Sequence, residues 1–294
     1  MIDKLEMFLA LARTRHFGKA AEECGVTQPT LSAAIRQLED QLGVMLVLRG
    51  SRFQGLTPEG KRVLEWARQI VGDARTMREE MRAAKQGLSG NLRIAAIPTA
   101  LNTASRLTNT FIEKNPNVRL TLLSEPSNRI LEMLEDLRID AGLTYMDNEP
   151  LGRVVTVPLY AERYVLLVRT DSPLAGRDSV GWKELGDVPL CLLTPDMQNR
   201  RIISDHLSEA GIEVNPTVES NSTIVLVSHI LFGGLATILP DRMAETFVRA
   251  DALVAIPIRR PDWSHQVGLI APYREPHTPV LAALIREAQR SAEV

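Results

Sequence analysis

Cysteine is scarce in this chain of 294 residues, which contains only Cys24 and Cys191. Two cysteines speak against a disulfide-stapled scaffold and against a metal cluster, and both are expected to fill small apolar spaces in the core. Long apolar runs are also missing, because the longest, residues 223–240, is interrupted by His229 and Gly233. We interpret that run as a helix, a glycine stop and a buried strand, which excludes a membrane span.

An excess of charge is lacking as well, since the net charge is only −2 and gives no overall sign of nucleic-acid binding. The charge is nevertheless uneven: residues 1–87 carry a net charge of +3 and the rest of the chain −5. A basic N-terminal part on an acidic body fits a DNA-binding head on a soluble module. The first residues, M-I-D-K-L-E-M-F, contain acids and no continuous apolar segment, so they are not a signal peptide. We therefore expect a cytoplasmic protein of two or three domains with no membrane partner.

Sequence motifs of catalysis are absent: the chain contains no G-x-S-x-G, no H-E-x-x-H, no P-loop and no paired cysteine ligands. The five histidines show no ligand spacing; they are His16, His206, His229, His265 and His277. His206 and His229 lie in helical patterns and are expected to be ordinary core or surface residues. The sequence thus favours a binding protein over an enzyme and predicts neither a metal nor a cofactor.

Residues 17–39 carry the most informative pattern, because two short helical segments meet there at Gly25. The first contains the small residues Ala20, Ala21 and Cys24, which allow a second helix to approach closely. Two helices joined by a tight glycine turn, the second with a polar outer face, are typical of a DNA-binding helix-turn-helix. The alternative is an αα-hairpin in an ordinary domain.

The second of these helices is expected to begin at Thr27, a good N-cap residue, with Pro29 in its first turn. Its inward face repeats apolar residues at helical spacing, namely Leu31, Ile35 and Leu38. Its outward face carries the hydrogen-bonding groups that read base edges in a major groove, namely Gln28, Thr30, Ser32, Arg36 and Gln37.

The next segment, residues 44–57, reads as a short β-hairpin, or wing. An apolar run at its start is followed by Arg49 and Arg52, which we expect at its tip. Cations there would contact phosphates or a minor groove. A solvated loop is the alternative, and the neighbouring helix-turn-helix favours the wing.

A long helix is predicted from Thr57, its N-cap, to the glycines at 87 and 90, which supply a hinge. At about 1.5 Å per residue, its roughly 27 residues span about 40 Å. Apolar residues recur at alternating steps of four and three, at Val63, Ala67, Ile70, Ala74, Met77, Met81 and Ala84. This heptad seam is too narrow for the helix to be buried within one domain, which indicates that it pairs with the same helix of a second chain. The alternative is a helix that packs only on its own subunit.

From residue 92 the pattern alternates between strands and helices, which predicts a doubly wound parallel sheet. A second such unit begins near residue 164. We expect a winged helix-turn-helix domain at 1–60, a linker helix and hinge at 61–90, and a two-lobed α/β domain at 91–294. Two crossing strands would divide the last of these into one lobe, 91–162 with 267–294, and another, 163–266, with a ligand-binding cleft between them.

The chain resembles LysR-type transcriptional regulators over essentially its full length. The most specific part of the resemblance is A-A-E-E-C-G-V-T-Q-P-T-L-S-A-A-I-R-Q-L-E-D-Q-L-G-V-M-L-V-L-R, followed by L-T-P-E-G. Val47 replaces the phenylalanine usual in the wing, and Gly18 replaces a serine usual at a helix start, where it is a weaker cap. The resemblance implies a dimerising linker helix, a periplasmic-binding-protein-like effector domain, and a tetramer of paired dimers that bends promoter DNA. RNA polymerase is a further partner that it leaves open.

The resemblance also assigns site residues. Those facing DNA are Gln28, Pro29, Thr30, Ser32, Arg36, Arg49 and Arg52. Those lining the effector cleft are Pro98, Thr99, Ala100, Asn102, Ser127, Asn128, Thr194, Gln198 and Asn199. Arg200 and Arg201 follow these in the sequence, and we expect one of them to turn inward. The cleft segments are small and polar, with helix N-termini and no aromatic wall, so we expect a small carboxylate or inorganic oxyanion as co-inducer. A transporter's solute-binding protein would share the two lobes, but it would need an export signal and lack the helical part in front.

Overall fold

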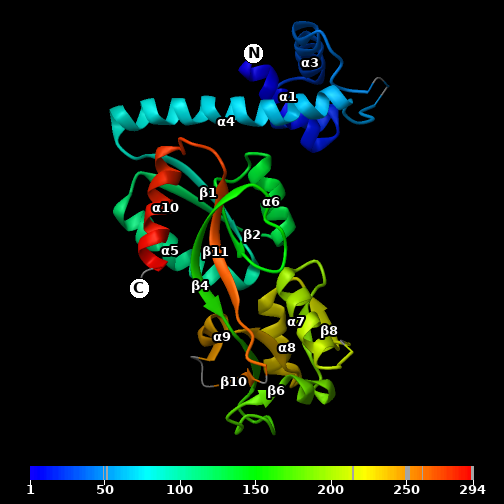
Figure 1. The fold of residues 1–294 in the computed structure, drawn as a ribbon, viewed down its shortest axis with the longest axis vertical. Coiled ribbons are helices and arrows are strands. Elements are labelled where there is room, and N and C mark those ends of the chain that lie inside the picture. Colours follow the sequence, from blue (N-terminus) through cyan, green and yellow to red (C-terminus); the bar gives the residue numbers. More distant parts are fainter. Residues whose placement is uncertain (49, 51, 214, 249–251, 260, 293–294) are drawn as a thin grey trace. The chain divides into compact units, whose positions relative to one another are not determined.

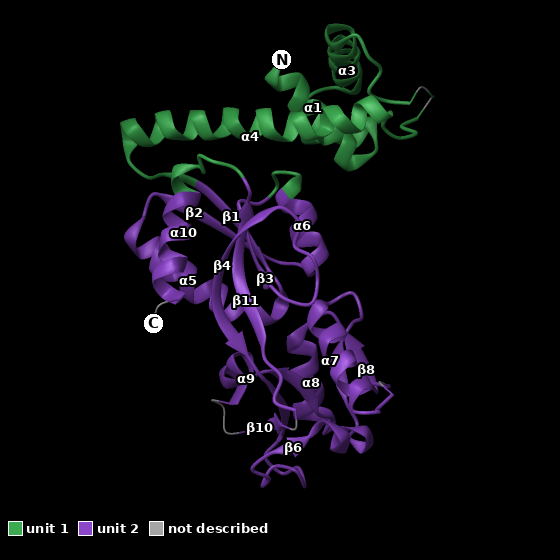
Figure 2. Cartoon of the chain, in the orientation of Figure 1, with its two compact units in different colours: residues 1–90, 135–138, 274–280 green, residues 91–134, 139–273, 281–294 purple. Residues whose placement is uncertain are grey.

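The computed structural model describes residues 1–48, 50, 52–213, 215–248, 252–259 and 261–292 (Figure 1). The chain forms two compact units, which Figure 2 distinguishes by colour. The first contains residues 1–90 together with the short segments 135–138 and 274–280, and the second contains the remainder. None of the described helices is both long and apolar enough to cross a membrane.

The first unit is built from four helices, α1 (Ile2–Thr14), α2 (Phe17–Glu23), α3 (Gln28–Leu42) and α4 (Pro58–Gln86). Its core includes Phe8 and Leu31, whose side chains are fully buried. The Thr27 side chain caps α3 by accepting a hydrogen bond from the Thr30 amide, as the sequence predicted. The expected weak cap at Gly18 is wrong, because α2 begins earlier and its cap is His16, whose Nδ1 accepts from the Lys19 amide at 3.2 Å.

The wing between α3 and α4 is reduced, in the described residues, to one antiparallel bridge between Val47 and Leu56. The buried carboxylate of Glu39 on α3 accepts hydrogen bonds from the amides of Leu46 and Val47 at 2.8 and 3.1 Å. Gly60 lets α4 approach closely, since a Cβ atom at this position would lie 2.1 Å from the Leu46 carbonyl oxygen. The base of the wing is therefore fixed to both neighbouring helices.

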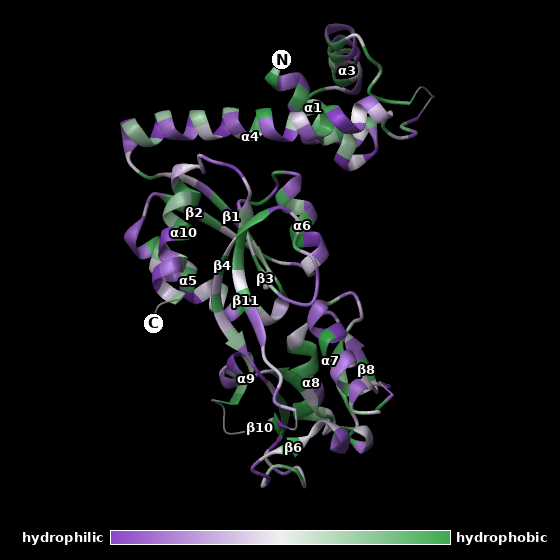
Figure 3. Ribbon diagram, in the orientation of Figure 1, coloured by the Kyte–Doolittle hydropathy of each residue, from purple (hydrophilic) through white to green (hydrophobic). Residues whose placement is uncertain are grey.

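Helix α4 starts at its predicted cap, with Thr57 Oγ1 accepting from the Gly60 amide at 2.9 Å, and it alternates hydrophilic and hydrophobic residues along its length (Figure 3). The predicted seam does not form one continuous outward stripe. Ala67 belongs to the core of this unit and Ala74 is also buried, whereas Ile70, Met77 and Met81 are exposed. The reason is that α1 packs on α4 and covers one side of the seam, which only the tertiary structure reveals.

The second unit has two lobes. Lobe I consists of β1 (Gly90–Ala96), a short 3-10 helix at Pro98–Ala100, α5 (Leu101–Lys114), β2 (Val118–Ser124), α6 (Ser127–Glu135), β3 (Ala141–Tyr145), β4 (Val154–Glu162), β11 (His265–Pro272) and α10 (Pro279–Ala292). Lobe II consists of β5 (Tyr164–Arg169), β6 (Val180–Gly181), a 3-10 helix at Trp182–Asp187, β7 (Cys191–Leu193), α7 (Gln198–Glu209), β8 (Val218–Ser220), α8 (Thr223–Gly233), β9 (Thr237–Pro240), α9 (Asp241–Val248) and β10 (Leu253–Arg259).

The sheet of lobe I has the strand order β2-β1-β3-β11-β4. It is mixed rather than purely parallel, since β1 and β3 are parallel while β11 runs antiparallel to both β3 and β4. The returning strand β11 causes this difference, because it enters lobe I from the opposite direction. Lobe II has a sheet of order β6-β10-β5-β9 and a separate pair, β7-β8. The chain crosses between the lobes after β4 and before β11, so these two strands form the hinge.

Candidate functional site

The first candidate surface lies on α3 and the base of the wing. Gln28, Pro29, Thr30 and Arg36 are exposed there, and Ser32 is half-buried. A hollow of about 500 Å³ gathers the α3 residues Gln28, Ser32 and Arg36 with wing residues that include Met45, Leu48 and Gly50. The predicted base-reading face and the wing therefore form one continuous surface. Arg52 is exposed, and Arg49 lies outside the described residues.

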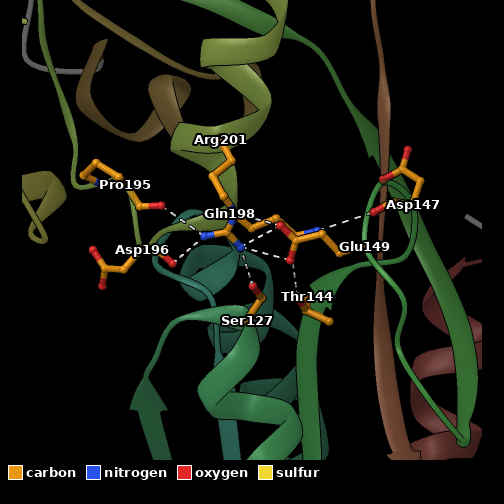
Figure 4. Close-up of polar contacts among 8 residues, drawn as sticks. All are labelled: Ser127, Thr144, Asp147, Glu149, Pro195, Asp196, Gln198 and Arg201. Carbon is orange, nitrogen blue, oxygen red and sulfur yellow. Dashed lines mark hydrogen bonds and ion pairs between the residues drawn. The ribbon is translucent and has the colours of Figure 1, made fainter.

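The second candidate site is the region where the two lobes of the second unit contact each other. There the first residues of α7, in lobe II, form hydrogen bonds with residues of lobe I (Figure 4). Thr144 on β3 donates to Gln198 Oε1 at 3.4 Å, and Gln198 Nε2 donates to the Asp147 carbonyl oxygen at 3.4 Å. Asn199 Nδ2 donates to the Tyr145 hydroxyl at 3.0 Å. The two predicted cleft residues on α7 thus join the lobes directly.

Arg201 supplies a positive charge where the two lobes meet. Its guanidinium contacts both carboxylate oxygens of Glu149, at 2.7 and 2.9 Å, and approaches Ser127 Oγ of lobe I at 3.4 Å (Figure 4). Arg200 instead turns into lobe II, where it pairs with Glu219 at 3.1 Å. Of the two arginines, Arg201 is therefore the one that contacts lobe I, where it brings together a cation, the first residue of α6 and a carboxylate.

The remaining predicted cleft residues are placed unevenly. Thr99 is buried, and its hydroxyl has no hydrogen-bond partner among the described residues; the same holds for the Thr194 hydroxyl. Asn102 on α5 hydrogen-bonds Thr246 on α9 and so forms another contact between the lobes. Pro98 and Ala100 are buried, while Asn128 is exposed. The α-helix expected from Pro98 begins only at Leu101, because a 3-10 turn comes first. The positive end of the helix dipole therefore lies at Leu101 and not at Pro98.

The sequence interpretation missed a buried polar network behind the cleft. Nε2 of His206 lies 2.9 Å from Nε2 of His265, and Nδ1 of His265 lies 3.1 Å from Asp147 Oδ2. The His206 ring also stacks on Trp263, with centroids 3.9 Å apart. Burial, and after it the positive charge that His265 can carry, lower the pKa of His206 to about 4, so the His206 ring is uncharged at neutral pH. Aromatic side chains therefore lie beside the cleft, although none belongs to the segments that the sequence assigned to it.

Glu162, at the end of β4, is the second part of this network. Its side chain is fully buried, and the Tyr145 hydroxyl donates to it. Burial raises the pKa of Glu162 to about 8, against the opposing effect of the Tyr145 hydrogen bond. The chain Asn199–Tyr145–Glu162 connects the tip of α7 to the hinge strand. No sequence motif could have identified it, because its members are far apart in the chain and their spacing has no periodicity.

Comparison with known proteins places these two surfaces in context. The family model described as "Bacterial regulatory helix-turn-helix protein, lysR family" matches residues 2–61, and the model described as "LysR substrate binding domain" matches residues 85–293. The chain is 30% identical to the DNA-binding transcriptional dual regulator OxyR of Escherichia coli strain K12, over 92% of this chain and 88% of that protein. It is 28% identical to a probable nitrogen assimilation transcriptional activator of Synechococcus elongatus, with the same two coverages.

Solved structures agree with the observed fold. A full-length OxyR variant from Pseudomonas aeruginosa superposes with a TM-score of 0.75 at 26% identity, covering 98% of this chain and 94% of that one. Full-length CbnR in complex with its target DNA superposes with a TM-score of 0.61 at 23% identity, covering 99% of this chain and all of that one (100%). The second likeness concerns the fold alone.

Proposed function

Since the chain belongs to the LysR family of DNA-binding transcriptional regulators, we propose that it binds a promoter site as an oligomer and responds to a small carboxylate or oxyanion. The anion is taken to bind between the lobes of the substrate-binding domain and to change the DNA contacts. The observation that supports this effector class is the guanidinium of Arg201, which already holds a carboxylate between the lobes. Promoter binding requires access to DNA, so we infer that the protein works in the cytoplasm, with RNA polymerase as a further partner.

The effector class follows from the chemistry of the cleft. A guanidinium binds carboxylates and oxyanions through paired N–H groups, and Ser127 at the first turn of α6 adds a hydroxyl and the positive end of a helix dipole. The buried hydroxyls of Thr99 and Thr194 offer further donors, because neither has a described partner. These groups suit a ligand with few atoms and several acceptor oxygens.

The proposed DNA contacts are tested by Arg36→Ala. Loss of a guanidinium that contacts a base or a phosphate should weaken operator binding by about 1–3 kcal/mol. A gel-shift titration at fixed salt measures this, and operators altered at single positions distinguish the two roles, since only a base contact also relaxes discrimination at one position. Arg13→Ala, on α1 and paired with Glu23 within the protein, is the matched control. Unchanged affinity in Arg36→Ala would remove this residue from the interface.

The proposed effector site is tested by thermal shift across a panel of short mono- and dicarboxylates, nitrate, sulfate and phosphate. A ligand that binds the folded state raises the melting temperature, by an amount that grows with its concentration above Kd. Arg201→Leu should abolish the rise, and Thr99→Val should remove most of it. Arg119→Leu, exposed on the edge strand β2, should respond like the wild type. Stabilisation only by bulky aromatic or phosphorylated compounds would contradict the small-anion assignment.

Peroxide sensing is a second function to weigh, because several curated relatives are named hydrogen peroxide-inducible genes activators. Thiol-based sensing requires an accessible thiolate. Cys191 is completely buried, and burial raises its thiol pKa to about 11. Burial also raises the pKa of Cys24, with the nearby Glu23 acting in the same direction. These two thiols are the only ones in the chain, so we infer that its effector is bound rather than sensed by thiol oxidation.

A further inference from the structure

The carboxylate of Glu149 binds the guanidinium of Arg201 as a carboxylate ligand would. Nε and Nη2 of Arg201 donate to the two carboxylate oxygens, at 2.7 and 2.9 Å, in the paired geometry that arginine uses to bind carboxylates (Figure 4). The third nitrogen, Nη1, donates to the carbonyl oxygens of Pro195 and Asp196 at 3.1 and 2.7 Å. Those carbonyls fix the direction of the guanidinium independently of Glu149.

The groups around this ion pair are ones that also bind free anions. Nη2 of Arg201 also lies 3.4 Å from Ser127 Oγ, so the Glu149 carboxylate sits where a cation of lobe II meets the first residue of α6 in lobe I. Cation, hydroxyl and helix N-terminus converge at this place. A free carboxylate ligand would use the same groups.

The ion pair of Glu149 with Arg201 is open to solvent. Glu149 lies between β3 and β4, in a turn where Asn148 has a φ of 72°. The side chains of Glu149 and Arg201 are 37% and 36% exposed, so solvent screens their attraction. The neighbouring pair of Arg200 with Glu219 differs, because the Arg200 side chain is only 8% exposed and both residues belong to lobe II. Because both arginines lie on α7, the Arg200–Glu219 pair serves as a matched comparison for the Arg201–Glu149 pair.

We propose that Glu149 is a built-in competitor, whose carboxylate fills the Arg201 site in the ligand-free protein and is displaced by a small carboxylate effector. This inference rests on the proposed function, since it concerns the same cleft. Displacement exchanges one carboxylate for another on Arg201, so the charge at the site stays balanced while the Glu149 side chain is released into solvent; Asp147 stays bound to Gln198 and His265. Glu149 would thereby set the concentration at which the effector acts.

Acetate is the appropriate probe, because it presents the carboxylate of a glutamate side chain on a single methyl group. The melting temperature of the full chain is measured against acetate concentration at constant ionic strength, with chloride as the balancing anion. We expect Glu149→Gln to bind acetate about fivefold more tightly than the wild type, the factor that an ion pair of this exposure contributes. Glu149→Asp, whose shorter side chain cannot reach both nitrogens, should lie between the two.

The control is Glu219→Gln, which removes the partner of Arg200 and should leave acetate binding unchanged. Equal or weaker binding by Glu149→Gln, with acetate still stabilising the wild type, would overturn the competitor role and leave the proposed effector site intact. If acetate and the rest of the anion panel stabilise neither protein, the proposed function fails and this inference fails with it. Arg201→Leu separates specific from general effects, because it should abolish acetate binding in the presence or absence of Glu149.

Discussion

Ile70→Glu should separate the protein into single chains and lower its affinity for a two-half-site operator by about 10²- to 10⁴-fold. The affinity loss is large because a single chain contacts one half-site and loses the advantage of two linked contacts. The expected cause is a carboxylate placed in an apolar helix–helix interface, where it would be buried without a partner. Sedimentation measures the mass, and a gel shift with one or two half-sites measures the affinity.

The structure shows which face of α4 is exposed and could therefore contact a partner chain. The large apolar side chains exposed on this helix are Trp66, Ile70, Met77 and Met81, exposed by 63, 40, 57 and 59%. Ala67 and Ala74, which the sequence assigned to the same seam, are already buried in the single chain. We therefore propose that a partner chain covers the Trp66–Ile70–Met77–Met81 face. A charged residue at position 67 would disrupt the core of the first unit and is therefore not a clean test.

Gln69→Glu is the matched control, since it adds the same charge one residue away, on a position that is exposed but outside the apolar face. It should keep the wild-type mass and operator affinity. Wild-type assembly in Ile70→Glu would show that α4 packs only on its own subunit, and dissociation of both variants would point to a general charge effect.

Glu162→Gln should remove a pH dependence of stability worth a few kcal/mol between about pH 4.5 and pH 8. Glu162 is fully buried, and no Lys or Arg forms an ion pair with it among the described residues. Its pKa is raised from 4.5 to about 8, chiefly by burial. The titratable groups around it are Tyr145 on β3, Asp147 after β3, Tyr160 on β4, Tyr164 on β5, Asp241 on α9 and, paired in register on β11, His265.

The sign of the effect follows from proton binding. Between pH 4.5 and 8 the folded protein keeps a proton on Glu162 that the unfolded chain has lost, so raising the pH favours the unfolded chain. The contribution of Glu162 to stability is therefore complete below pH 4.5 and is lost as the pH rises toward 8. His206 acts in the opposite sense, since its pKa is lowered to about 4 and its contribution is lost as the pH falls below 6.5. Comparison of wild type with Glu162→Gln isolates Glu162, because both proteins contain His206.

The measurement is the melting temperature of both proteins at intervals from pH 5 to pH 9. The wild type should fall relative to Glu162→Gln as the pH rises, with the difference levelling off above pH 8. A constant offset is also expected, because the glutamine amide replaces an oxygen, Oε2, that has no described hydrogen-bond partner. Glu113→Gln, at an exposed position on α5, should run parallel to the wild type. Parallel curves for Glu162→Gln would mean that Glu162 is not protonated in the folded protein at neutral pH.

The sequence by itself determined the local elements whose signals lie within a few residues. Thr27 and Thr57 cap the helices predicted for them, because a hydroxyl at that position satisfies an amide of the first turn. Leu31, Ile35 and Leu38 are buried together, because their spacing places them on one face of α3. The alternation of strands and helices likewise predicted the two lobes, since parallel strands require crossover connections.

The tertiary structure decided every feature that depends on residues distant in the chain. It buried Ala67 and left Ile70 exposed, although both fit one heptad pattern, because α1 covers only part of α4. It brought Arg201 against Glu149, and His206 against His265, across 52 and 59 residues. Local spacing carries no information about such pairs. They form because β4 and β11 cross between the lobes and bring residues from separate elements to the hinge. There the pKa of a side chain is set by its burial and not by its neighbours in the sequence.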